Sequence, residues 1–299
     1  MGPIPDWYGE IYPAGPNDGF YTKLGEHSLA YVERNLSQLV ITFDNLSGAG
    51  HEGYDKRAWA SGFCSYNNWS HLGVFAQGPT WFRDDRLVDY LEKLRDDGFF
   101  ERFDYVTLSG TSMGAYGALV FSRLYPGATV IAFSPQTTLD MEKVPWETRY
   151  GKGKKADWDI PGSDAAACIG SAGKVYVVYD PLERLDRKHA ERLVGRNVVY
   201  LKGPGFGHKS ALFLQRMEAL KPILGEAVIG TLDGERFHKA VRRRGDFYLY
   251  RMNMEDHLRA RGREHLIPVV QELFKARRRR KIRWAKRRAK RLAAKRASA

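Results

Sequence analysis

The stretch Asp104-Tyr-Val-Thr-Leu-Ser-Gly-Thr-Ser-Met-Gly-Ala-Tyr-Gly117 lies near the middle of this 299-residue chain and decides how the rest is interpreted. Its first five residues are mostly β-branched or aromatic and predict a strand, whereas the residues from Met113 onward predict the start of a helix. Gly110, Ser112 and Gly114 form a Gly-x-Ser-x-Gly pattern between the two. A serine on a strained strand-to-helix turn needs neighbours without bulk, so the pattern predicts an accessible Ser112 that can act as a nucleophile. The alternative is a glycine-rich turn in which the serine only caps the helix.

Short apolar runs alternate with helical patterns on both sides of this stretch. This alternation predicts parallel strands joined by right-handed crossovers, and strands that are apolar throughout fit a sheet covered on both faces. We therefore expect an α/β fold over residues 18–224, with a mostly parallel central sheet and helices on both faces. The expected strands are 39–43, 71–75, 104–108, 129–133, 174–179 and 197–201, after a hairpin at 20–33, and the expected helices are 84–96, 113–125, 182–194 and 209–220.

Other segments flank or interrupt this domain. Residues 1–17 are expected to form an N-terminal arm. An insert at about 135–173 is rich in Gly, Lys, Asp and Pro and follows the carboxyl end of a strand, which predicts a lid or a binding loop; a mobile surface excursion is the alternative. Beyond residue 224 the pattern is helical only, which predicts a helical extension over 225–274 and a basic amphipathic tail over 275–299.

The composition excludes several classes of protein. Hydrophobic residues make up 43% and charged residues 28% of the chain, which is ordinary globular usage and excludes disorder throughout. Two cysteines, Cys64 and Cys168, are too few for a disulfide scaffold, and no Cys/His cluster has the spacing of a zinc site. The sequence has no apolar run of about 18 residues and no secretory signal at its start, so we expect a cytoplasmic protein.

The positive charge is concentrated at the C-terminal end. The chain carries a net charge of +13, and residues 275–299 hold 14 Lys and Arg with no acidic residue, so residues 1–274 are nearly neutral. This argues against a wholly basic nucleic-acid-binding domain. The tail predicts a cationic helix whose narrow apolar stripe, which includes Ile282 and Leu292, fits an anionic membrane surface such as the inner face of a membrane. Nucleic acid is the rival partner, and a disordered solubilising tail is the third alternative.

A serine nucleophile needs a base, and the base needs an acid that orients it. Asp180 follows the strand expected at 174–179, and His208 follows the next strand and a glycine-rich loop. The carboxyl ends of parallel strands form the rim where open α/β sheets bind ligands, so Ser112, Asp180 and His208 are expected to meet there. Asp186 is a competitor for the acid. We favour Asp180 because Asp186 is expected to lie inside a helix.

The order Ser112, Asp180, His208, together with the Gly-x-Ser-x-Gly turn, resembles the α/β-hydrolase superfamily over roughly residues 18–224. The resemblance implies that Ser112 is the nucleophile, Asp180 the acid and His208 the base. It also implies an oxyanion hole built from the backbone N–H of Met113 and of a residue in the loop 44–48, either Asn45 or Leu46. That loop departs from the His-Gly-Gly-Gly pattern of many lipases.

These residues predict a serine hydrolase that cleaves a carboxylic ester through an acyl-enzyme and needs no metal or organic cofactor. The many aromatic residues and the polar insert favour a small-molecule or glycan-linked ester as substrate, and a thioester or an amide is left open. An acyltransferase with the same triad is the first alternative. The second is an inactive scaffold with this fold that binds an anionic partner through its tail. The sequence does not indicate the oligomeric state.

Overall fold

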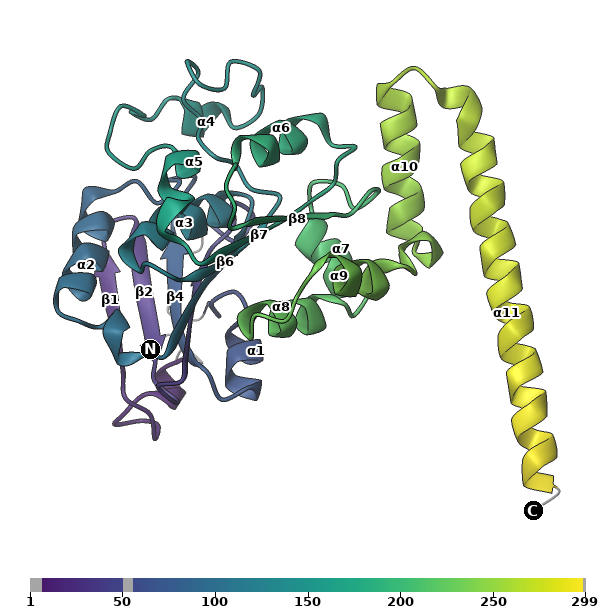
Figure 1. Cartoon of the computed structure of the whole chain (residues 1–299), viewed down its shortest axis with the longest axis horizontal. Coiled ribbons are helices and arrows are strands. Elements are labelled where there is room, and N and C mark those ends of the chain that lie inside the picture. The colour runs from purple at the N-terminus through teal and green to yellow at the C-terminus, as the bar shows by residue number, and fades with distance from the viewer. Residues whose placement is uncertain (1–6, 51–55, 298–299) are drawn as a thin grey trace.

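The structure of the protein is a computed structural model that describes residues 7–50 and 56–297. Within them, eight strands form one sheet in the order β1-β2-β4-β3-β5-β6-β7-β8, of which β1 and β2 are antiparallel to their neighbours and the others are parallel (Figure 1). This confirms the predicted mostly parallel α/β sheet. The strands are β1 (Gly19–Leu24), β2 (His27–Val32), β3 (Gln38–Phe43), β4 (Ser70–Ala76), β5 (Tyr105–Thr111), β6 (Thr129–Phe133), β7 (Lys174–Tyr179) and β8 (Val198–Lys202).

Helices cover both faces of the sheet, because successive strand residues point to opposite sides. In β6, for example, Val130 and Ala132 pack in one apolar cluster and Ile131 and Phe133 in the other. The first cluster includes α2 (Asp85–Asp96), α3 (Met113–Phe121), α5 (Ala165–Cys168) and α6 (Arg184–Arg192). The second includes α1 (Ser61–Tyr66), α7 (Ser210–Arg216), α8 (Leu220–Val228) and α9 (Gly234–Val241).

Two expected helices differ in their bounds. The helix expected at 113–125 ends at Phe121 and continues as a 3-10 turn. The helix expected at 209–220 is broken into α7 and α8, because Glu218 adopts a left-handed conformation with φ of 59° between them. This break gives the chain a corner next to the cavity described below.

The insert between β6 and β7 is packed against the domain. It contains α4 (Gly151–Lys154) and α5, and lies at the top of the view in Figure 1. Several of its side chains are fully buried, among them Thr137, Leu139, Val144 and Glu147. A long insert can pack in this way only where its polar groups find partners, and those partners belong to the site described below.

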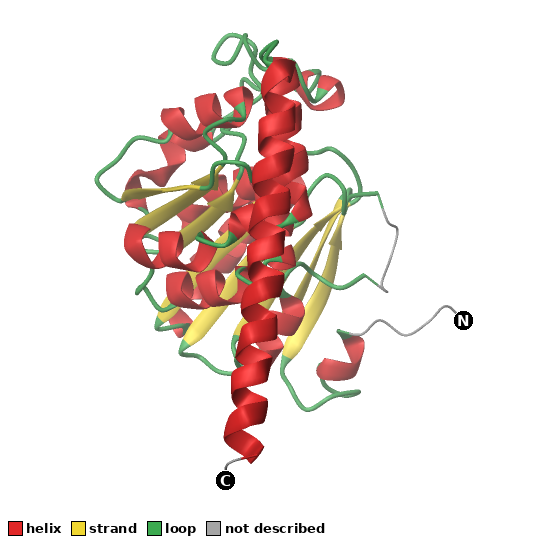
Figure 2. Cartoon of the chain, turned by 90° about the vertical axis from the view of Figure 1, so that its right-hand side faces the viewer, coloured by secondary structure: helices red, strands yellow, loops and turns green. Residues whose placement is uncertain are grey.

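The C-terminal region is helical, with α10 (Tyr248–Ala260) and α11 (Ile267–Ala297) forming a helical hairpin. Only the first turns of α11 pack on α10, through Gln271 to Glu255 and through the ring of Phe274 beneath Arg251. The rest of α11 runs alongside the sheet domain and stands apart from it in Figure 1, and it passes in front of the sheet in the view of Figure 2. In the part of the chain that the structure describes, no helix combines the length and the apolar character needed to cross a membrane.

Candidate active site

Ser112 lies on a strained turn between β5 and α3. Its backbone has φ of 55° and ψ of −116°, a conformation that residues other than glycine rarely adopt. A Cβ atom at Gly110 would overlap the backbone of Gly114, and a Cβ atom at Gly114 would overlap the carbonyl oxygen of Phe43 at the end of β3. Both glycines are therefore required for the turn to close, which is the steric reason expected from the sequence pattern.

His208 connects Ser112 to a buried carboxylate. Its Nε2 lies 3.1 Å from Ser112 Oγ, and its Nδ1 lies 2.7 Å from Asp186 Oδ2. Because an ionised carboxylate only accepts hydrogen bonds, His208 carries its proton on Nδ1 and leaves Nε2 free to accept the serine proton. Burial raises the pKa of Asp186, but hydrogen bonds and charges from His208 and Arg149 outweigh burial, so the pKa lies below its usual value. The carboxylate beside His208 is therefore ionised.

The expectation that Asp180 pairs with His208 is wrong. Its carboxylate instead accepts hydrogen bonds from the backbone N–H groups of Leu182, Gly205 and Gly207 at 2.8 to 2.9 Å. Asp180 thus binds the loop that leads to His208, and it positions the imidazole through the backbone of that loop. Asp186 reaches the imidazole because it lies in the first turn of α6, which begins at Arg184 with that turn facing the rim. A position inside a helix therefore does not exclude Asp186, because the first turn of α6 presents its carboxylate to His208.

The insert contributes two polar side chains that the sequence analysis did not identify. Gln136 Nε2 lies 3.1 Å from Ser112 Oγ and 3.2 Å from the hydroxyl of Tyr150. That hydroxyl lies 3.2 Å from His208 Nε2. The signal for Gln136 was its place two residues after Ser134, at the carboxyl end of β6 on the same rim as Ser112. Nothing local marks Tyr150, which lies within an irregular segment.

A chain of charges ties the insert to Asp186. Arg149 Nη1 donates to Asp186 Oδ1 at 2.7 Å, and its guanidinium also binds both oxygens of Glu147. Glu147 accepts in addition from His189 Nε2 at 3.0 Å, while His189 Nδ1 accepts from the backbone N–H of Thr137. Burial raises the pKa of Glu147, but these partners outweigh it and bring the pKa to about 2. Burial lowers the pKa of His189, which is consistent with a neutral ring that donates from Nε2.

The residues expected to form an oxyanion hole lie beside Ser112. Met113 is the first residue of α3, so its N–H belongs to the unpaired first turn of that helix. Asn45 and Leu46 line the same cavity as Ser112 and His208. The side-chain oxygen of Asn45 accepts hydrogen bonds within its own loop, from Gly48 N at 2.8 Å and from Ser47 Oγ at 2.6 Å. The choice between Asn45 and Leu46 stays a prediction.

Ser112 opens into a cavity of about 740 Å³. Polar groups gather near the serine, where Arg149, Tyr150 and Lys209 contribute to the wall. The lining also includes the apolar side chains of Trp59, Ala211, Leu212 and Leu220. Within residues 7–50 and 56–297, no group of three or more His, Cys, Asp or Glu side chains is arranged to hold a metal ion. The cavity therefore offers a nucleophile, a base and both polar and apolar surfaces.

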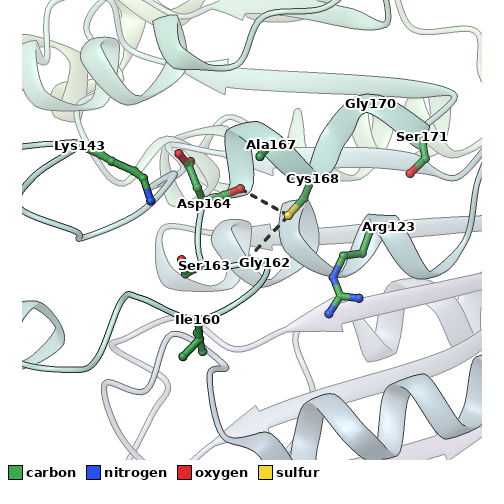
Figure 3. Close-up of a pocket in the computed structure, with 10 residues that line it drawn as sticks. All are labelled: Arg123, Lys143, Ile160, Gly162, Ser163, Asp164, Ala167, Cys168, Gly170 and Ser171. Carbon is green, nitrogen blue, oxygen red and sulfur yellow. Dashed lines mark hydrogen bonds between the residues drawn. The ribbon is translucent and has the colours of Figure 1, made fainter.

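A second hollow, of about 530 Å³, lies around Cys168 and is lined by a different set of residues (Figure 3). Arg123, Lys143 and Asp164 are its charged groups, and Asp164 is paired with Arg192. Cys168 lies 3.4 Å from the carbonyl oxygen of Asp164, and burial raises the pKa of its thiol. The raised pKa lowers the fraction of thiolate, which is the nucleophilic form. The hollow shares no lining residue with the cavity at Ser112.

Comparison with known proteins adds likeness in structure only. No known family model matches the chain, and no curated protein matches it in sequence. Among solved structures, a capsule O-acetyltransferase of Neisseria meningitidis serogroup A has a TM-score of 0.44 and 14% identity, covering 68% of this chain and 94% of its own. An esterase of Pyrococcus furiosus has a TM-score of 0.46 and 15% identity, covering 72% and 91%.

A fluorophosphonate-binding serine hydrolase of Staphylococcus aureus has a TM-score of 0.47 and 12% identity, and the match covers 72% of this chain and 99% of that one. At these identities each likeness concerns the fold alone. This chain itself shows three features of its fold: the strand order, the antiparallel β2 and the strained turn that follows β5. The chain has the mostly parallel α/β sheet, covered by helices on both faces, that its resemblance to the α/β-hydrolase superfamily implied.

Proposed function

We propose that this protein is a serine hydrolase that cleaves a carboxylic ester through an acyl-enzyme intermediate. The observation that carries the proposal is the continuous hydrogen-bonded line from Asp186 through His208 to Ser112. Such a line supplies the nucleophile, the base and the orienting acid in the order that acyl transfer requires. It supports Asp186, in place of Asp180, as the acid of the triad.

The reaction follows from this geometry. His208 Nε2 takes the proton of Ser112 as Oγ bonds to the ester carbonyl carbon, and the carbonyl oxygen becomes an oxyanion that accepts from the N–H of Met113 and a donor at residue 45 or 46. The carbon–oxygen bond to the alcohol then breaks, and His208 returns the proton to the departing oxygen. Water repeats the sequence on the acyl-enzyme, with His208 as its base, and releases the carboxylic acid. Asp186 stabilises the imidazolium in both halves.

Gln136 and Tyr150 hold the serine and the imidazole in place while no substrate is bound. Gln136 contacts Ser112 Oγ and Tyr150 contacts His208 Nε2, and both of these atoms take part in the reaction. A bound ester would therefore replace these two hydrogen bonds. Polar groups that line the cavity, including Arg149 and Lys209, favour an ester whose alcohol half is polar, such as a small polyol or a glycan-linked group.

Acyl transfer is the second candidate, because an acceptor hydroxyl in place of water completes the same cycle. The cavity is wide enough at about 740 Å³ to admit such an acceptor. The hydrogen-bonded line from Asp186 to Ser112 is complete, and this argues against an inactive scaffold. Burying the charges of Asp186 and Arg149 costs stability through desolvation, and an inactive protein would gain nothing in return.

A fluorophosphonate probe tests the proposal directly, because such probes form a bond only with an activated serine. We expect covalent labelling of the full chain, none in Ser112→Ala, and labelling slowed by several orders of magnitude in His208→Ala. Intact-mass measurement gives the stoichiometry, and thermal unfolding of each variant gives the folding control. Labelling of Ser112→Ala at the rate of the parent chain would refute the assignment.

A further inference from the structure

The cavity at Ser112 adjoins a second cavity of about 550 Å³. Trp59, Gln215 and Leu220 line both, so the two cavities meet at these three side chains. The adjoining cavity lies between α1 and the corner where α7 gives way to α8.

The adjoining cavity has an apolar floor and a polar rim. Its floor is formed by the apolar side chains of Trp59, Ala60, Phe63, Leu220 and Leu224. Gln215, Glu218 and Lys221 are exposed and stand at its edge. Trp59, Ala60 and Leu220 are partly exposed in this cavity, and covering their apolar surface with an apolar group lowers the free energy.

Trp59 holds a fixed position at the junction. Its carbonyl oxygen accepts from Thr42 Oγ1 at 2.8 Å, and its ring meets the ring of Phe133 edge to face at 6.0 Å. Both partners belong to strands of the sheet, so the wall at the junction is formed before a ligand arrives. A preformed apolar wall lowers the cost of ordering a flexible chain against it.

We propose that the adjoining cavity holds the acyl chain of the substrate, so that the preferred esters carry a medium or long unbranched acyl group. This inference rests on the proposed function, because it places the acyl carbonyl at Ser112. The alcohol half then lies towards Arg149 and Lys209, and the chain passes Trp59 and Leu220 to reach Leu224. Hydrolysis needs only water as co-reactant and yields a free alcohol and a medium- or long-chain carboxylic acid.

The chain-length dependence of inactivation tests this inference. Two fluorophosphonates, one with an ethyl and one with a dodecyl chain, are compared by their second-order rates of labelling of the full chain. Each buried methylene contributes roughly fourfold, so the dodecyl probe is expected to react at least about tenfold faster. Equal rates, or a faster ethyl probe, would overturn the inference and leave the serine hydrolase intact. No labelling by either probe would instead refute the proposed function.

Gly62 offers a matched pair of variants. It lines the adjoining cavity as well as a smaller one of about 260 Å³, and a Cβ atom built on it meets no heavy atom within 4 Å, so a side chain can begin there without a clash at Cβ. Gly62→Leu is expected to lower the ratio of dodecyl to ethyl labelling at least about tenfold by filling the cavity. Gly170→Leu is the control, because Gly170 has equal free space but lines the hollow of Figure 3. An unchanged ratio in Gly62→Leu would overturn the inference.

Binding to an inactive variant separates the cavity from catalysis. In Ser112→Ala, titration calorimetry with dodecanoate is expected to give an affinity at least about tenfold higher than with butyrate, and adding Gly62→Leu removes the difference. This measurement decides the inference even when no probe reacts. Equal affinity for the two acids would overturn it.

Discussion

At the scale of single residues, the two aspartates near His208 do different work. Asp186 is fully buried and accepts from the imidazole, whereas Asp180 is nearly buried and accepts from three backbone N–H groups. Burial raises the pKa of Asp180 even though those three N–H groups oppose the rise. One carboxylate therefore acts on the base, and the other shapes the loop that carries the base.

Because the two aspartates have different contacts, we expect replacement of one to affect catalysis and replacement of the other to affect stability. Asp186→Asn is expected to lower kcat on a short soluble ester by about 10⁴, because an amide favours the wrong imidazole tautomer. Asp180→Asn is expected to act mainly on folding, at a cost of about 1–3 kcal/mol, because an amide leaves backbone donors unsatisfied. Steady-state kinetics and urea unfolding measure the two effects. A kcat loss near 10⁴ in Asp180→Asn with normal activity in Asp186→Asn would restore Asp180 as the acid.

At the scale of elements, the insert between β6 and β7 completes the site. Its residues Gln136, Arg149 and Tyr150 contact the serine, the aspartate and the histidine of the triad. Glu147 anchors the arginine and is itself fully buried beside His189. The insert is therefore tied to the domain through ionised groups, and its attachment depends on pH.

Glu147 gives this pH dependence a defined range. Its folded pKa of about 2 lies below the ordinary value of 4.5, so its contribution to stability is present above about pH 4.5 and is lost as pH falls towards 2. The free energy of unfolding of the parent chain is expected to fall more steeply between pH 4.5 and 2 than that of Glu147→Gln. Urea unfolding at half-unit pH intervals measures both slopes. Parallel slopes would show that Glu147 is not the group responsible.

At the scale of the whole molecule, charge is segregated. Residues 275–299 hold 14 basic residues. Nine of them, at positions 275, 277–280, 283 and 286–288, are exposed on α11. Ile282 and Trp284 are also exposed on this segment, at 49% and 61%. We propose that this segment binds an anionic membrane surface, where each basic residue near the headgroups contributes about 1 kcal/mol.

Deleting residues 275–299 is expected to leave hydrolysis of a small soluble ester intact and to abolish co-sedimentation with phosphatidylglycerol vesicles. Phosphatidylcholine vesicles are the lipid control, and Ile282→Ser combined with Leu292→Ser tests the apolar contribution. Equal vesicle binding by the full and the shortened chain would refute the proposal. Binding that depends on charge and salt but is unaffected by the double variant would indicate nucleic acid as the partner.

The sequence by itself determined the parts that depend on neighbours along the chain. Apolar periodicity predicted the parallel sheet, and glycine spacing predicted the turn at Ser112, because both are constraints within a few residues. His208 was found because a strand end and a glycine loop mark its position on the rim. Tertiary structure alone decided between Asp180 and Asp186, since the direction of the first turn of α6 depends on how that helix packs. It also brought Gln136, Arg149 and Tyr150 to the site, because irregular segments carry no periodic signal that predicts which distant groups they meet.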